Sequence, residues 1–280
     1  FKIFTLASIM FITNVFIPAF PGGDPRVPSE RLTVFVPHKS FKEFSNNEAY
    51  GAMSEGIFLW DIGDKWSKIG SPTDGEENFI KDFKVWHVHK QGIWVYYHST
   101  MTIDGWIHRG DPKLIPVSDD LVSIHWGGST SHRVYVKNAD IQGMEFGILN
   151  RARGSGELMV IKDSYLRNFV DIRIRPWSQN PPSGKRQTFL DNVKFDLLPV
   201  AGMSGNGYAI QMDYNPASSS NTNIPDLNYV FNYNKAQGDN FQTFYTVQGT
   251  KNTAGGLAPC KDTRPNILGY ACPFSGISVP

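Results

Sequence analysis

The chain has 280 residues, of which 40% are hydrophobic and 19% charged, and its formal net charge is +1. This composition is typical of a folded protein with a large core and excludes an intrinsically disordered chain. A nearly neutral chain has no bulk attraction for nucleic acid or an anionic membrane, so neither is a predicted partner. Glycine, proline and aromatic residues are abundant, which favours a β-rich, loop-rich fold.

The first segment in chain order, residues 1–20, has one charged residue, Lys2, followed by a mainly apolar run, and it resembles a secretory leader. Pro18 and Pro21, however, stand where a leader needs small residues for cleavage. We therefore expect this segment to belong to the folded protein and the chain to be part of a longer one, with a leader as the alternative. No apolar stretch has the length of a membrane-spanning helix, so no membrane span is predicted.

A short pattern recurs along the chain: an apolar position, any residue, Asn or Asp, any two residues, and another apolar position. Its matches lie 22 to 36 residues apart, and their polar residues are Asn14, Asn46, Asp82, Asp104, Asn138, Asp163 and Asn192. Asn and Asp tolerate left-handed backbone and hydrogen-bond locally. The pattern therefore predicts a sharp corner at each of these positions.

A short alternating segment with one apolar face follows each corner, which is typical of a β-strand. The predicted strands are residues 32–36, 57–60, 93–96, 122–126, 148–151, 172–175 and 208–213. Corners and strands that alternate at this interval predict a solenoid of stacked strands. A doubly wound α/β fold is disfavoured because the connecting segments are rich in Gly, Pro, Ser and Asn and lack amphipathic helices.

Two stretches, VKNADIQGMEFGILN (136–150) and IKDSYLRNFVDIRIR (161–175), resemble single coils of the right-handed parallel β-helix, the pectate-lyase-like architecture. The resemblance covers residues 1–215 and implies an all-β solenoid of about seven coils. The coil NNEAYGAMSEGIFLW (46–60) also resembles, weakly, β-helix regions of extracellular G8-domain proteins, a carbohydrate-associated group. Both resemblances imply a secreted or cell-surface protein.

We expect residues 1–214 to form the parallel β-helix and residues 215–280 to form a linker, a capping hairpin and a cysteine-containing tail. Residues 229–248 are predicted to be two strands joined by a turn at Gly238, which would cover the exposed end of the helix. Cys260 and Cys272 would form a disulfide in an oxidising compartment, and a pair of free thiols is the alternative.

Stacking the predicted strands sorts their side chains into columns. The predicted inward columns are Ile57/Ile93/Val122/Ile148/Ile172 and Leu59/Val95/Ile124/Asn150/Ile174. The predicted outward columns are Phe58/Trp94/Ser123/Leu149/Arg173 and Trp60/Tyr96/His125/Arg151/Arg175. The outer face thus changes from aromatic to basic along the stack.

This outer face is the predicted binding surface for an acidic polysaccharide. Flat aromatic rings match the C–H faces of sugars, and Arg forks pair with carboxylate or sulfate. The predicted substrate-binding residues are Phe58, Trp60, Trp94, Tyr96 and Arg175. The alternative is that a long segment, such as 61–78 or 178–186, covers this face.

Candidate catalytic residues are His125, Arg151 and Arg173. In a β-elimination, Arg would neutralise a uronate carboxylate while His125, flanked by Tyr96 and Arg151, moved the proton. The resemblance implies Asp clusters for Ca²⁺ or Asp pairs for hydrolysis, but neither signature is present, so no metal or other cofactor is assigned. The His87-x-His89 pair is not predicted to bind metal, because His87 aligns with the corner residues Gly51, Gly143 and Asn168.

The sequence therefore predicts an extracellular β-helix that binds, and in one version cleaves, an acidic polysaccharide. An enzyme of this kind would be a polysaccharide lyase or a glycoside hydrolase. The alternative is a non-catalytic carbohydrate-binding or structural segment of a larger extracellular protein with additional domains.

Overall fold

The computed structural model describes residues 15–16, 32–35, 43–52, 54–62, 77–98, 100–117, 121–127, 133–151, 158–174, 186–203, 207–212, 227–231, 244–246, 267–268 and 270–272. Within these residues the fold is all-β, and the one helical element is a short 3₁₀ helix, η2 (Pro112–Val117). A search of the described residues finds no helix of the length and apolarity that crossing a membrane requires. The all-β prediction is confirmed.

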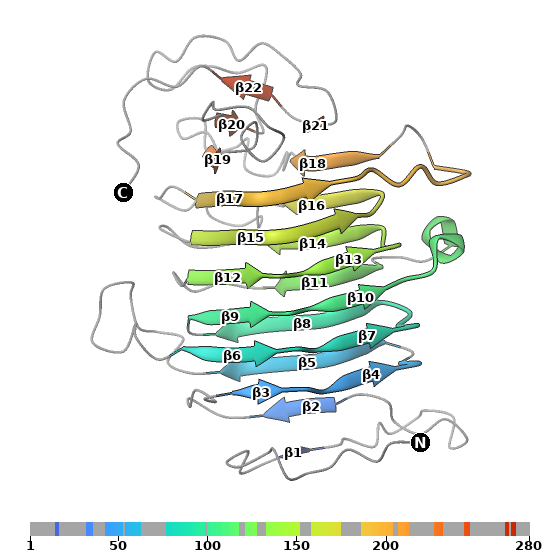
Figure 1. Ribbon diagram of the computed structural model, residues 1–280, viewed down its shortest axis with the longest axis vertical. Coiled ribbons are helices and arrows are strands. Elements are labelled where there is room, and N and C mark those ends of the chain that lie inside the picture. The colour runs from blue at the N-terminus through green and yellow to red at the C-terminus, as the bar shows by residue number, and fades with distance from the viewer. Residues whose placement is uncertain are drawn as a thin grey trace, which may run out of the picture.

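One sheet, called sheet A here, runs along the stack of strands in Figure 1. Its neighbouring strands are parallel, except that β1 is antiparallel to β2. In spatial order its strands are β1 (Val15–Phe16), β2 (Leu32–Phe35), β5 (Glu55–Ile62), β8 (Gln91–His98), β11 (Val122–Gly127), β14 (Phe146–Arg151), β16 (Val170–Ile174), β18 (Tyr208–Met212) and β21 (Ile267–Leu268). Sheet A contains all seven strands predicted from the alternating pattern.

The second sheet, sheet B, lies against sheet A in Figure 1 and consists of two rows of strands. The first row is β22 (Tyr270–Cys272), β20 (Phe244–Thr246), β19 (Leu227–Phe231), β17 (Arg186–Phe195), β15 (Leu158–Arg167), β12 (Arg133–Lys137), β9 (Met101–Asp104), β6 (Asn78–Lys81) and β3 (Phe44–Ser45). The second row is β4 (Glu48–Tyr50), β7 (Lys84–Trp86), β10 (Ile107–Arg109) and β13 (Asp140–Gln142), which pairs with the end of β15. Parallel strands in stacked rows are a solenoid-like arrangement.

Corners with left-handed backbone join the two rows of sheet B. Positive φ values of 47° to 56° occur at five predicted corner residues: Asn46, Asp82, Asn138, Asp163 and Asn192. The side chains of neighbouring coils also bond at these corners, since Asn138 Nδ2 donates to Asp104 Oδ1 at 2.7 Å and Asn192 Nδ2 to Asp163 Oδ1 at 2.7 Å. These bonds offset part of the strain of the left-handed backbone.

The corner predicted at Asp104 is displaced by one residue. Asp104 pairs with Lys81 and Lys137 inside the strands, and the positive φ (75°) belongs to Gly105. A Cβ atom at Gly105 would lie 2.6 Å from Asp82 Oδ1 on the coil below. Glycine is therefore required both for the backbone angle and for this close approach. The predicted corner at Asn14 lies outside the described residues.

Branched apolar side chains from both sheets form the core, and those of sheet A stand in columns. Ile57, Ile93, Ile148 and Ile172 are fully buried register partners, as predicted. At β11, however, Ile124 occupies this column in place of the predicted Val122. The neighbouring column likewise contains Trp126 instead of Ile124, between Val95 and Asn150. The predicted alignment of β11 was therefore wrong by two residues.

Beyond β18 the chain adds strands to both sheets. β19 is parallel to β17 and antiparallel to β20, and β20 is antiparallel to β22. The two strands predicted within 229–248 therefore do pair as an antiparallel ladder. Gly238 and Cys260 lie outside the described residues, so the turn, the disulfide and the boundary at residue 214 stay predictions.

The corner at Asn138 gives a direct test of the left-handed backbone. Asn138→Val should reduce the free energy of unfolding by about 1–2 kcal/mol relative to Asn138→Gly, because a β-branched residue is strained at φ 50° and glycine is not. Both variants lose the bond to Asp104, so the comparison isolates the backbone. Urea denaturation would measure the difference, and equal stability of the two variants would contradict the assignment.

Candidate functional site

Three rings form a column along the outer face of sheet A on consecutive strands, with Phe58 tilted by 55° against Trp94 and only Trp94 and His125 stacked. Phe58 on β5 pairs in register with Trp94 on β8, which pairs with His125 on β11. The Phe58 and Trp94 ring centroids lie 4.9 Å apart, and the Trp94 and His125 rings stack at 5.6 Å with an interplanar angle of 12°. This aromatic column is the part of the predicted binding surface that the structure brings together.

The register of β11 changes the surroundings predicted for His125. His125 lies between Trp94 and Leu149 in its column, not between Tyr96 and Arg151. Arg151 instead pairs with Gly127 at the end of β11. The prediction was therefore wrong in placing His125 in the column Trp60/Tyr96/His125/Arg151/Arg175. His125 takes the place predicted for Ser123 beside Trp94, and Ser123 is fully buried. The catalytic roles of His125, Arg151 and Arg173 stay predictions.

The exposure of the aromatic column varies along its length. Phe58, Trp94 and Arg173 are half-buried, whereas His125 is 2% exposed and Leu149 is fully buried. The middle of this face is therefore buried, and because residues 63–76 and 175–185 lie outside the described residues, the alternative of a covering segment stays a prediction.

The remaining predicted site residues are described only in part. Arg173 lies on β16 in register with Leu149, and its guanidinium carbon is 4.3 Å from the centre of the Phe146 ring. This is a close cation–π contact that holds the Arg173 fork against the sheet. Trp60 and Tyr96 are register partners on β5 and β8. Arg175 lies outside the described residues.

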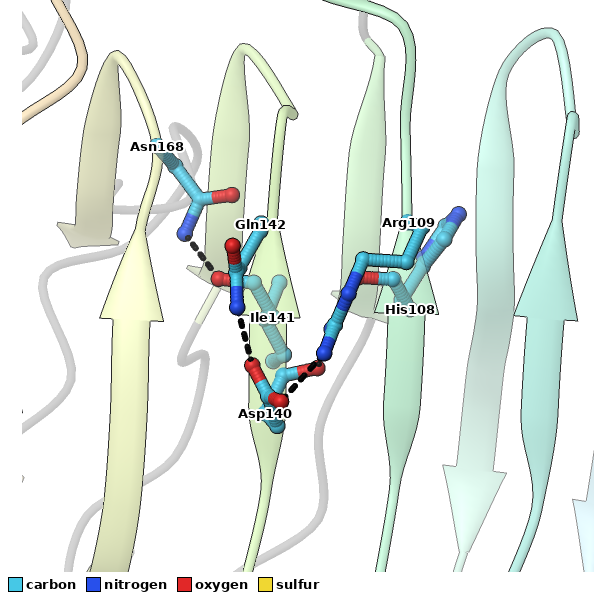
Figure 2. A network of polar contacts seen from close by, with 6 residues as sticks. All are labelled: His108, Arg109, Asp140, Ile141, Gln142 and Asn168. Carbon is cyan, nitrogen blue, oxygen red and sulfur yellow. Dashed lines mark hydrogen bonds and ion pairs between the residues drawn. The ribbon is translucent and has the colours of Figure 1, made fainter.

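A second group of polar side chains, which the sequence pattern did not predict, lies on the outer face of β10 and β13 (Figure 2). Arg109 Nη1 donates to the Asp140 carbonyl at 2.8 Å, and Nη2 forms an ion pair with the Asp140 carboxylate. Gln142 Nε2 donates to Asp140 Oδ1 at 2.7 Å. Asp140 and Gln142 are two residues apart on β13, whereas Arg109 precedes Asp140 by 31 residues. Only the register of β10 with β13 brings Arg109 to the other two.

His108 precedes Arg109 and points into the core, where it is fully buried. Its Nδ1 lies 2.8 Å from Ser123 Oγ, which also accepts a hydrogen bond from Trp106 Nε1 at 3.0 Å. Its Nε2 has no hydrogen-bond partner among the described residues. Burial, assisted by the positive charge of Arg109, lowers the pKa of His108 to about 3. His108 is therefore a neutral member of the core.

A buried carboxyl group lies at the start of β16. Asp171 Oδ1 accepts bonds from the Asn168 backbone N–H at 2.8 Å and from Asn168 Nδ2 at 2.9 Å. The same Asn168 amide donates to the Ile141 carbonyl, as Figure 2 shows, and accepts from the Met144 N–H. Burial raises the pKa of Asp171 well above its ordinary value, against the opposing effect of the Asn168 bonds. This network closes a corner and is inaccessible to a ligand.

No group of three His, Cys, Asp or Glu side chains able to hold a metal ion occurs within the described ranges. The predicted corner position of His87 is confirmed by its positive φ of 51°, alongside Gly51 and Gly143.

No protein-family model, curated protein or solved structure matches the chain.

Protonation of His108 should destabilise the fold in acid. The folded protein resists protonation down to about pH 3 whereas the unfolded chain accepts a proton near 6.5, so stability is full above pH 6.5 and falls below it. This one group should contribute a slope of about 1.4 kcal/mol per pH unit between those values. The free energy of unfolding should be measured by urea denaturation at several pH values. Its fall with decreasing pH should be less steep in His108→Gln than in the parent protein by this amount.

The matched control is His89→Gln, since His89 is exposed. It should retain the full acid slope of the parent protein. An unchanged slope in His108→Gln would show that His108 is not the buried neutral group described.

Proposed function

We propose that the chain is a right-handed parallel β-helix of the pectate-lyase-like type, about seven coils long, from a secreted or cell-surface protein. We propose further that it binds an acidic polysaccharide along the outer face of sheet A, without cleaving it. The observation that carries the proposal is the column of adjoining rings Phe58, Trp94 and His125, with Arg173 further along the same column.

The chemistry of this column fits an anionic sugar polymer. The half-buried rings of Phe58 and Trp94 offer an apolar surface to sugar C–H groups. Trp60 and Tyr96 are register partners on the same two strands. Arg173 supplies a fixed cation two strands beyond His125. Because the buried stretch at His125 and Leu149 separates rings from cation, the polymer would contact the two ends of the column.

Cleavage is the second candidate function, and it would use His125 as the general base with Arg151 and Arg173 neutralising a uronate carboxylate. Two observations favour binding over cleavage. His125 is 2% exposed, so a substrate in solution does not reach its ring as the described residues are arranged. The described part of this outer column also contains no pair of carboxylates for hydrolysis.

The proposal predicts that a uronic-acid polymer retards the protein in affinity electrophoresis, with less retardation at high salt because an ion pair is screened. Trp94→Ala and Arg173→Gln should each weaken binding by about three- to tenfold, since aromatic and charged contacts contribute about 1 kcal/mol each. Tyr135→Ala, which removes a half-buried ring from β12 in sheet B, is the control and should bind like the parent protein.

Cleavage is tested in the same samples by the ultraviolet absorbance of unsaturated products. We expect retention without product release. Product release that disappears in His125→Ala would support the lyase instead, and a failure of every uronic-acid polymer to retard the protein would remove the binding proposal.

A further inference from the structure

A row of exposed and half-buried side chains crosses the second row of sheet B on its outer face. Tyr50, Trp86, Arg109, Gln142 and Arg167 are successive register partners on β4, β7, β10, β13 and β15, and we call them the Tyr50–Arg167 column. Their neighbours Ala49, Val85, His108, Ile141 and Leu166 are buried, so the column itself faces outward. At about 4.8 Å per strand it spans about 19 Å.

Aromatic rings occupy one end of this column. Tyr50 is 72% exposed and is the one large hydrophobic side chain in the described part of the chain that is so exposed. His87 packs edge-on against it, with ring centroids 5.5 Å apart, and Trp86 beside it is half-buried. An aromatic ring held in place but left open to solvent is a feature typical of binding surfaces.

Fixed hydrogen-bonding groups occupy the middle of the column. Asp140 holds both the Arg109 guanidinium and the Gln142 amide, as Figure 2 shows, so neither side chain has to be ordered when a ligand binds. The guanidinium has N–H groups beyond those that Asp140 and the His108 carbonyl accept, and the Gln142 Oε1 atom remains an acceptor. Donors and acceptors thus alternate over a short distance.

Charged side chains on this face lie beside side chains of opposite charge. Arg109 pairs with Asp140, Arg167 Nε lies 3.5 Å from Asp196 Oδ2, and Glu48 is the register partner of Lys84. A surface of compensated charges does not concentrate a polyanion, in contrast to the outer face of sheet A with Arg173. It suits an uncharged ligand that is rich in hydroxyl groups.

We propose that the Tyr50–Arg167 column binds a neutral pyranose glycan. A sugar ring stacks its C–H face on Tyr50 and Trp86, and the hydroxyl groups of the adjoining sugars bond to Arg109 and Gln142. A hydroxyl group both donates and accepts, which matches the paired guanidinium and amide oxygen. This site is separate from the proposed acidic-polysaccharide surface and does not depend on it.

The test is affinity electrophoresis of the whole chain in gels that contain xylan, glucomannan or a β-glucan. At least one of these neutral polymers should retard the parent protein, and raising the salt concentration should leave the retardation unchanged because no ion pair with the ligand forms. Tyr50→Ala should weaken binding about tenfold. Because the Tyr50 ring is exposed, its removal should leave the protein folded, so a loss of binding would not reflect unfolding. Gln142→Ala should weaken it several-fold.

Tyr135→Ala is the matched control, because it removes a half-buried ring from the other row of sheet B, and it should bind as the parent protein does. Trp94→Ala should also leave neutral-glycan binding intact, which separates this site from the surface on sheet A. The proposal is overturned if none of the three polymers retards the protein, or if Tyr50→Ala binds as tightly as the parent. Retardation that high salt abolishes would overturn it too.

Discussion

The structure depends on a sharp, left-handed turn that the chain repeats at the same place in successive coils. Each turn places one residue at positive φ, a conformation that costs an ordinary L-residue about 1–2 kcal/mol. Asn, Asp and Gly reduce that cost, and the amide–carboxylate bonds between coils, such as Asn192 to Asp163, favour stacking of like corners. Once the corners stack, the strands on either side have little freedom in their register.

That register decides what each face of the molecule can do. It places isoleucines from successive coils in one buried column, and it places Phe58, Trp94 and His125 in one outer column. It also allows polar residues inside the core, because the Ser123 hydroxyl meets the His108 ring across the interior. A buried polar group is tolerated when it is bonded, and the neutral His108 ring satisfies this condition at one nitrogen.

Much of this arrangement could be predicted from the sequence, because corners and strands leave local patterns. The Asn/Asp pattern located five left-handed corners, and it missed Gly105 because the pattern admitted Asn and Asp but not the residue that best tolerates positive φ. The shift of β11 has a different cause. Val122, Ile124 and Trp126 alternate with polar residues, so a slip of two residues preserves the apolar face and no local signal reveals it. Contacts between coils, such as those of Arg109 with Asp140, also leave no local pattern, because they depend on the register of β10 with β13.

The register of adjacent coils is therefore the central claim, and cysteine cross-linking tests it most directly. Lys84 and Ile107 are partners on the outer face of β7 and β10, where parallel strands lie about 4.8 Å apart and a disulfide can form. Lys84→Cys combined with Ile107→Cys should oxidise to a cross-link between the two peptides, detected by mass spectrometry. Lys84→Cys combined with Arg109→Cys, which is two residues out of register, should not. Cross-linking of the second pair in preference to the first would contradict the stacking described.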